Sequence, residues 1–241
     1  MFVREPQRGA TDVRPITADS TEEATSLSAT LGLFFTNKTL TLVSLAAGAT
    51  QFVTYATLGF TTLFLMREKG MTLDQVALWY ALVLAIGVSG GIYLSSRIID
   101  ARATTAPQVY GTAPGYALLL AVPFFIGFVW APTWPLAMAF LIGPTFLNYF
   151  YLTPAVAFVQ SAVAPRQRTL AGAVLLLIMN LIGLGLGPTW LGMASDWFKA
   201  DHPGNSLQLA FYTLIPFYFL AIALHFALAR ALKRGSPKAS S

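Results

Sequence analysis

The 241-residue sequence contains no cysteine and few charged residues. The absence of cysteine excludes a disulfide framework and thiolate metal sites. Charged residues make up 10% of the chain and apolar residues 56%, whereas an ordinary soluble domain has about 25% charged residues. So few charges cannot cover a soluble surface. The net charge of +5 does not indicate nucleic-acid binding, because the basic residues lie between apolar blocks and not in one patch.

The apolar residues form six blocks, each near or above the roughly 20 residues needed to cross the hydrocarbon core of a bilayer. We expect membrane spans at residues 40–66, 76–97, 112–130, 136–160, 170–194 and 207–229. The sequence therefore predicts an all-α, multi-pass membrane protein that lies in a lipid bilayer.

The first 36 residues are polar and have no apolar stretch after a basic start, so they do not resemble a signal peptide. The sequence Ser-Thr-Glu-Glu at 20–23 fits a capping box that opens a short helix, with Leu27, Leu31 and Phe34 on one face. We expect that helix to lie along the membrane surface. The chain then divides into a polar cytoplasmic segment (1–36), a six-helix transmembrane bundle (37–232) and a basic cytoplasmic tail (233–241).

The distribution of lysine and arginine predicts the orientation of the bundle. Six spans place both termini on one side, and twelve of the fifteen basic residues fall in the segments on that side. Basic residues near span ends favour the cytoplasm. We therefore expect both termini in the cytoplasm, with the protein in the inner (plasma) membrane.

None of the ten acidic residues lies inside a predicted span. A charge at the centre of a spanning helix costs about 2.5–3.5 kcal/mol, so a charge found there usually has a function. This chain has no such carboxylate for proton or sodium coupling. Two histidines and no cysteine are too few for a metal site, and no phosphate-binding glycine loop is present. We predict no metal, no cofactor and no enzymatic activity.

Uncharged polar residues follow the first and fourth spans at helical spacing. They include Gln51, Thr54 and Tyr55 in the first span, and Asn148 and Tyr151 in the fourth. Inside a membrane such groups need partners or water. They can serve as interhelical hydrogen bonds, worth about 0.6 kcal/mol each, or line a substrate cavity. Both readings stay open for Gln51 and Asn148.

The fifth span contains a glycine-rich run from Asn180 to Pro188. Gly183 and Gly187 are four residues apart and share a helix face, which permits close approach of a neighbouring helix. Pro188 removes a backbone hydrogen bond and can bend the helix. The run therefore predicts helix packing, bending or both.

Several motifs resemble the second half of major facilitator superfamily transporters, and in particular the spinster-like branch. They are Pro-Arg-Gln-Arg-Thr-Leu-Ala-Gly at 165–172, the 180–188 run, and Gly-Met-Ala-Ser-Asp at 192–196. Gly91, Arg97 and Asp100 fall at the place of a cytoplasmic loop motif of that family, although the motif is degenerate here. Arg166 and Arg168 lie in a second cytoplasmic loop.

The resemblance covers nearly the whole chain and implies a fold. Transporters of this family contain two six-helix halves, each built from 3+3 inverted repeats, with the substrate site at the midplane between them. The resemblance implies that this chain is the C-terminal half only, and that its first and fourth spans line the cavity. It also implies that the residues tied to proton coupling lie mainly in the other half.

Two functions follow from these features. The resemblance implies that the chain is the C-terminal half of a secondary active transporter, which we expect to move a small organic or lipid-like amphipathic solute by alternating access. Its partner would be an N-terminal six-helix half. Alternatively, it is a truncated or self-associating membrane protein without transport activity, in which a second copy covers the polar stripes. Neither function involves nucleic acid.

Overall fold

The computed structural model describes residues 27–235, and every regular element in that range is a helix. The elements in order are α1 (Leu27–Thr36), α2 (Lys38–Arg67), α3 (Leu73–Arg102), α4 (Val109–Trp130), α5 (Trp134–Leu147), η1 (Asn148–Tyr151), α6 (Leu152–Ala162), η2 (Pro165–Gln167), α7 (Arg168–Asn180), η3 (Leu181–Leu186), α8 (Gly187–Lys199), α9 (Ser206–Tyr212) and α10 (Ile215–Gly235). The predicted all-α membrane fold is confirmed.

Five helical stretches in the described part of the chain are long and apolar enough to cross a membrane. They correspond to the second through sixth predicted spans. The first predicted span, α2, is not among them, because its threonines, glutamine and tyrosine lower its hydropathy. With 30 residues it extends about 45 Å, which is enough to cross a bilayer. The six predicted spans therefore correspond to six long helical segments.

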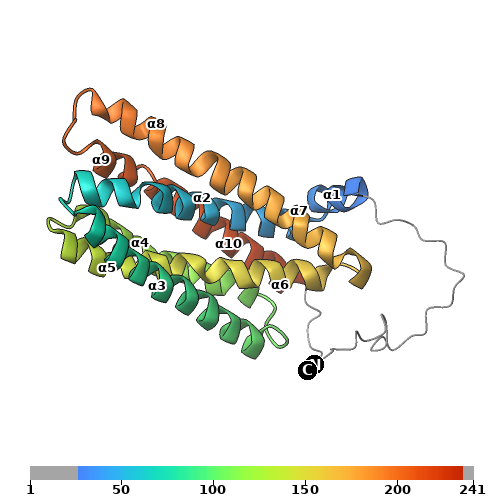
Figure 1. Cartoon of the computed structure of the whole chain (residues 1–241). Coiled ribbons are helices and arrows are strands. Elements are labelled where there is room, and N and C mark those ends of the chain that lie inside the picture. The colour runs from blue at the N-terminus through green and yellow to red at the C-terminus, as the bar shows by residue number, and fades with distance from the viewer. Residues whose placement is uncertain (1–26, 236–241) are drawn as a thin grey trace, which may run out of the picture.

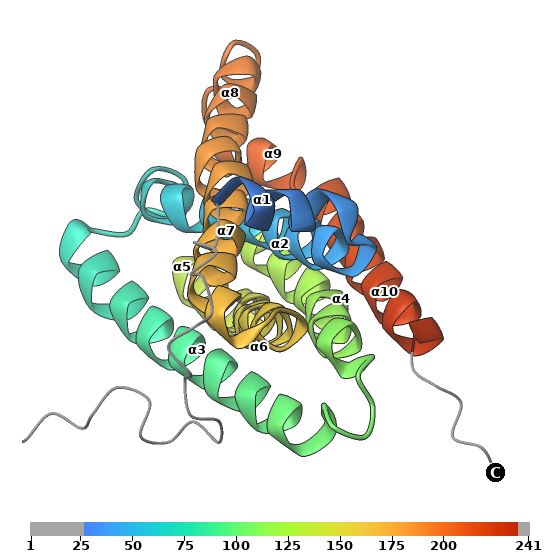
Figure 2. The ribbon, with the colours of Figure 1, turned by 90° about the vertical axis from the view of Figure 1, so that its right-hand side faces the viewer.

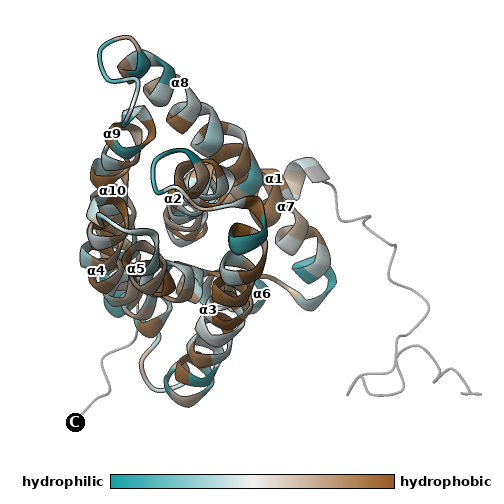
Figure 3. Cartoon of the chain, turned by 60° about the vertical axis from the view of Figure 1, so that its left-hand side comes forward, coloured by the Kyte–Doolittle hydropathy of each residue, from teal (hydrophilic) through white to brown (hydrophobic). Residues whose placement is uncertain are grey.

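The helical segments run side by side along one direction, and successive segments are antiparallel (Figure 1). The α2 helix packs against α10, α8, η3 and α7, so it is the most enclosed of the long helices. Seen end-on, α3 and α8 lie at the periphery (Figure 2). Hydrophilic residues gather mainly at the loop ends, and hydrophobic residues cover most of the helix lengths (Figure 3). We call the two loop ends of the bundle the α2–α3 end and the α3–α4 end.

The short first helix packs against the bundle, on α2 and α7. Its Phe34 is 1% exposed and belongs to an apolar cluster with Leu40 and Val43 of α2. Asn37 then caps α2, since its Oδ1 accepts hydrogen bonds from the backbone N–H of Thr39 and Leu40. The capping box predicted at 20–23 lies outside the described residues.

The fourth predicted span is interrupted by the 3₁₀ turn η1, just before Pro154. Proline lacks an N–H, so the carbonyl of Phe150, four residues earlier, loses its helical donor. Ser95 of α3 supplies the missing bond, with its Oγ 2.8 Å from the Phe150 oxygen. Gly91, one turn before Ser95, is so close to the backbone of Phe146 that no side chain fits there. The α3 helix is thereby held against this interruption.

The α3 helix is longer than the sequence predicts and corrects the position of one motif. The prediction ends the span at Arg97, whereas α3 continues to Arg102. Arg97 and Asp100 therefore lie in the last turns of α3 and not in a loop, and Gly91 lies inside the helix, within the predicted span. A capping box at Thr72 and Gln75 opens this helix at the other end.

The fifth predicted span contains a π-helical segment, η3, between α7 and α8. Such segments are rare and are often found at functional sites. This one occupies the glycine-rich run and ends just before Pro188, which lies in the first turn of α8. Because Pro188 has no N–H, the regular hydrogen-bond ladder is broken at this point.

Candidate functional site

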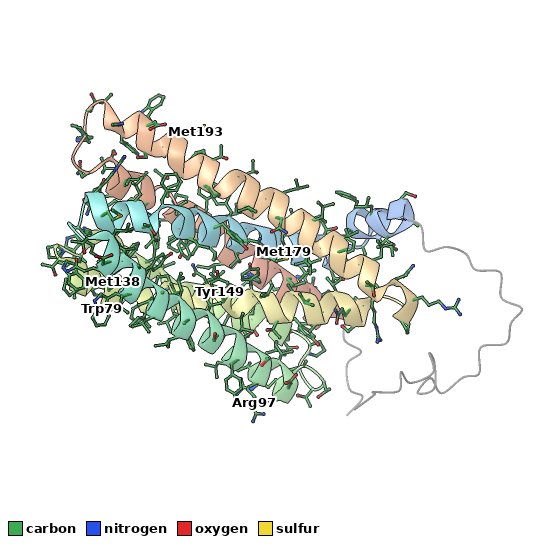
Figure 4. The ribbon with its side chains drawn as sticks, viewed as in Figure 1. Trp79, Arg97, Met138, Tyr149, Met179 and Met193 are labelled. Atoms are coloured by element: carbon green, nitrogen blue, oxygen red, sulfur yellow. The ribbon has the colours of Figure 1, made fainter. Side chains whose placement is uncertain are left out.

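The polar residues predicted from the sequence lie near one another, about midway along the bundle. Gln51 and Thr54 of α2 are 3% and 5% exposed, and Tyr55 is half-buried. Tyr149 and Tyr151 of η1 approach Tyr55 from the fourth span. Figure 4 shows Tyr149 near the middle of the bundle, far from both loop ends.

Gln51 joins three elements through its side-chain amide. Its Nε2 donates to Asn180 Oδ1 at 2.8 Å, and its Oε1 accepts from the hydroxyl of Tyr151 at 3.3 Å. These two hydrogen bonds connect α2 to η1 and to the last residue of α7. Asn180, which the sequence groups with packing and bending, is thus part of the polar cluster.

Asn148 is paired with a tyrosine from the last span. Its Nδ2 lies 2.9 Å from the hydroxyl of Tyr218, and that hydroxyl lies 3.3 Å from Asn148 Oδ1. Both side chains are buried. Beside Asn148 is a pocket of about 20 Å³ that Thr54 and Tyr149 also line. This volume holds about one water molecule. Asn148 therefore has an interhelical partner and lies beside one small pocket.

Glycines allow the fifth span to approach α2 closely at this level. A Cβ on Gly183 would lie 2.7 Å from the Cβ of Gln51, and one on Gly187 would meet the backbone of Phe52 and Ala56. Pro188 lies 3.7 Å from the position of a Cβ on Gly59. The close approach at Gly183 brings Asn180 within hydrogen-bonding distance of Gln51.

The charged residues of the two loop motifs have no partners in the described part of the chain. Arg97 and Asp100 are exposed on the last turns of α3. Arg166 and Arg168 are exposed at η2 and at the first residue of α7. All four lie at the α3–α4 end, where their charges are free to meet another surface.

His225 is a second buried polar side chain of the last span, and it contacts Thr50 of α2. The two side chains lie 3.0 Å apart, between His225 Nε2 and Thr50 Oγ1. The Thr50 hydroxyl also lies 2.9 Å from the Ala46 carbonyl oxygen of its own helix. The bond between His225 and Thr50 links α10 to α2.

Sequence reasoning missed a charged pair at the α2–α3 end. The Glu68 carboxylate accepts from the backbone N–H of Leu207 at 2.8 Å and Gln208 at 3.0 Å, at the start of α9. Lys69 Nζ donates to the carbonyls of Val129 and Ala131 at the end of α4, at 3.3 and 2.6 Å. The negative charge of Glu68 thus lies at the N-terminal end of α9 and the positive charge of Lys69 at the C-terminal end of α4, where the helix dipoles attract these charges.

Burial perturbs both groups of this pair. It raises the pKa of Glu68 above its usual value, against the opposing effect of the two backbone N–H donors and of Lys69. It lowers the pKa of Lys69, against the attraction of Glu68. The signal in the sequence is the position of two opposite charges directly after a span, but sequence alone does not give their partners.

The central cluster contains no charged side chain among its described residues. Within residues 27–235, no cluster of three or more histidine or acidic residues is placed to hold a metal ion. The central cluster consists of amides, hydroxyls and aromatic rings, which orient a ligand through hydrogen bonds and apolar contact.

Comparison with known proteins agrees with this description, although no protein-family model matches the sequence. A curated MFS-type efflux pump from Mycolicibacterium smegmatis is 31% identical to the chain over 182 residues. Those residues are 75% of this chain and 42% of the pump.

Two solved structures share the fold. A bacterial homologue of the human lysosomal transporter Spinster, inward-facing and unoccupied, matches with a TM-score of 0.77 and 26% identity, covering 99% of this chain and 56% of that one. The structure of a bacterial Spinster homologue in the inward-facing, occupied conformation matches with a TM-score of 0.72 and 23% identity. The match covers 86% of this chain and 52% of that one. The chain therefore spans about half the length of the proteins it matches.

Fold and site together define a multi-pass membrane protein of six helical spans with an uncharged polar centre. Sequence and fold relate it to the transporters of the major facilitator superfamily, and within them to the spinster-like proteins. The resemblance found in the motifs is thereby confirmed. These relatives are transporters and not enzymes.

Proposed function

We propose that this chain is the C-terminal six-helix half of a secondary active transporter. With an N-terminal half it moves a small organic or lipid-like amphipathic solute by alternating access. The protein lies in the inner membrane with both termini in the cytoplasm, as the basic residues at the α3–α4 end favour. The segment before residue 37 connects the two halves.

The observation that carries this proposal is the match in fold. Nearly the whole chain, 99%, superposes on 56% of one spinster-like transporter. In transporters built from two repeated halves, the substrate site lies between the halves near the bilayer midplane. The Gln51 cluster lies midway along the spans, as that site requires.

The exposed faces of the outer helices support a partner half. Only 22% of the most apolar stretch of α3 is buried within this chain, less than in the other four apolar spans. On the fifth span, Leu181 is 63% exposed beside the exposed amide of Asn180. An amide facing lipid is unfavourable, so we assign this surface to the second half and the cavity.

Within this proposal the predicted residues take different parts. Gln51, Thr54, Asn148 and Tyr151 are buried and support the cavity wall from behind, and half-buried Tyr55 is the member of this predicted set that a solute can contact. The approach and bending of the fifth span depend on Asn180, Gly183, Gly187 and Pro188. The cytoplasmic contacts of the moving halves involve the exposed Arg97, Asp100, Arg166 and Arg168, whereas Gly91 packs against Phe146 within this half.

A chimeric protein tests the proposal. The segment of the M. smegmatis pump that aligns with this chain is replaced by this chain, and the chimera is expressed in cells lacking the pump. Efflux is followed with a fluorescent dye that the parent pump exports. The proposal predicts dye efflux by the chimera and none by this chain expressed alone.

Two results would contradict the proposal. One is a chimera that reaches the membrane in normal amount and exports none of a panel of dyes. The other is transport by this chain alone as a monodisperse dimer, which would show that a second copy and not an N-terminal half completes the site. A dimer without transport would support the self-associating alternative.

A further inference from the structure

Three side chains form a hydrogen-bonded path from the core to the surface. The Tyr151 hydroxyl donates to Gln51 Oε1, and Gln51 Nε2 donates to Asn180 Oδ1. Tyr151 and Gln51 are each 3% exposed, whereas Asn180 is exposed. The path therefore begins in the protein interior and ends at an open surface.

Tyr151 fixes the direction of this path. If both amides turned around, Asn180 would donate to Gln51 and Gln51 to the tyrosine oxygen. The Tyr151 hydroxyl would then lose Gln51 Oε1, the acceptor that it has in the structure. A buried hydroxyl without an acceptor carries the full cost of its lost hydration. The arrangement that satisfies Tyr151 is the one in which every donor points toward Asn180.

The consequence is that Asn180 turns its NH₂ group away from the core. Its oxygen accepts from Gln51, and its nitrogen has no hydrogen bond to any described residue. The neighbouring Leu177, Leu181 and Leu184 are 50%, 63% and 54% exposed. Asn180 lies near the middle of the apolar stretch Pro165–Lys199. Two N–H donors thus stand alone on an apolar surface at membrane depth.

We propose that Asn180 is a specificity residue that donates to an acceptor oxygen on the substrate, such as a carbonyl, ester or phosphoryl oxygen. The exposed leucines contact the apolar part of the same molecule. Gln51 and Tyr151 are positioning residues, because they hold the Asn180 amide in the donating orientation. This inference rests on the proposed function, since it takes the surface around Asn180 as part of the cavity.

Binding of two matched probes tests the inference without requiring transport. The probes are 1-hexanoylpyrene, which has one carbonyl, and 1-hexylpyrene, which has none. Energy transfer from the five tryptophans to pyrene reports binding to the purified full chain in detergent. The quantity compared is the ratio of the two dissociation constants in each variant, relative to the wild type. Partition of the probes into detergent cancels in this comparison.

We expect Asn180→Leu to reduce the preference for the ketone by about two- to tenfold, the worth of one neutral hydrogen bond. Tyr151→Phe should reduce it as well, because it frees the Gln51 amide to turn around. Thr189→Val is the matched control, since exposed Thr189 on α8 bonds only to the Gly185 carbonyl of its own helix. It should leave the preference unchanged.

The inference is overturned if Asn180→Leu leaves the ratio unchanged, or weakens both probes equally, which would mean that Asn180 serves only packing. The chimera reports separately on the proposed function. An inactive chimera together with a lowered ketone preference would refute the transport proposal and leave the donor assignment intact. An active chimera together with an unchanged ketone preference would support the transport proposal and refute the donor assignment.

Discussion

Replacing Gly183 by alanine should disrupt the contact between the fifth span and α2. The new Cβ would lie 2.7 Å from the Cβ of Gln51 and 3.0 Å from its backbone carbonyl carbon. To reach an ordinary contact, the two helices must separate by about 0.7 Å, so the Gln51–Asn180 bond, now 2.8 Å, stretches beyond the usual limit of about 3.2 Å.

The energy follows from this geometry. Overpacking costs about 1–3 kcal/mol, and an interhelical hydrogen bond in a membrane protein is worth about 0.6 kcal/mol. Alanine in place of glycine returns up to about 1 kcal/mol of helix propensity. We expect a net loss of about 1–2 kcal/mol, or about 2–8 °C in Tm for a chain of this size.

Gly185 provides a control in the same π-helical segment. A Cβ on Gly185 meets only the Asn180 carbonyl oxygen, at 3.8 Å, so alanine fits without movement. Gly185→Ala should therefore add up to about 1 kcal/mol of helix propensity, which keeps the Tm unchanged or raises it by up to about 4 °C. The assay is thermal denaturation in detergent, followed by size-exclusion chromatography. Equal Tm values for the two variants would refute the proposed close contact at Gly183.

Two further predictions concern the other polar contacts. Asn148→Leu should destabilise the protein by about 1–3 kcal/mol because it leaves the buried Tyr218 hydroxyl without a partner. The double variant with Tyr218→Phe should recover most of this loss, and additive effects in a thermal double-mutant cycle would disprove the pairing. For Glu68, burial raises the pKa in the folded state above the ordinary 4.5, so the folded protein binds this proton more tightly than the unfolded chain. The stabilisation from Glu68 is therefore fully present below pH 4.5 and is lost as the pH rises through the raised pKa. Glu68→Gln should remove this pH-dependent fall in Tm, measured between about pH 4 and 7. Identical profiles of Tm against pH for wild type and variant would contradict a raised pKa of Glu68.

The spans could be predicted from the sequence because membrane helices follow local rules. Long apolar blocks need no knowledge of tertiary contacts, and each of the six blocks corresponds to a helical segment in the structure. The predicted ends of the spans were less accurate than their existence. The α3 helix continues past Arg97 to Arg102, since charged residues continue a helix beyond the hydrocarbon without difficulty.

The partners of the polar residues could not be predicted, because they come from distant parts of the chain. Gln51 meets Asn180 and Tyr151, which are 129 and 100 residues away. The glycine spacing indicates a close contact on the fifth span, but not which helix fills it. The π-helical segment also has no local signal beyond Pro188 and its preceding glycines. Glu68 was missed because its role depends on a backbone terminus and not on another side chain.

The most direct test of the account is whether the face bearing Asn180 lies in a water-filled cavity when the second half is present. The chain has no cysteine of its own, so single cysteines report without background once the remainder of the chimera is made cysteine-free. Thiosulfonate reagents require a thiolate, which forms in water and not in lipid. Phe219 on α10, 52% exposed and outside the surface assigned to the second half, is the control for a position that the proposal leaves to lipid.

The account predicts that a charged, membrane-impermeant thiosulfonate modifies Asn180→Cys rapidly in the assembled chimera and leaves Phe219→Cys unmodified. Equal protection of both cysteines would place the Asn180 face against lipid or buried protein. That result would contradict the central claim that this six-helix chain forms one wall of a transport cavity.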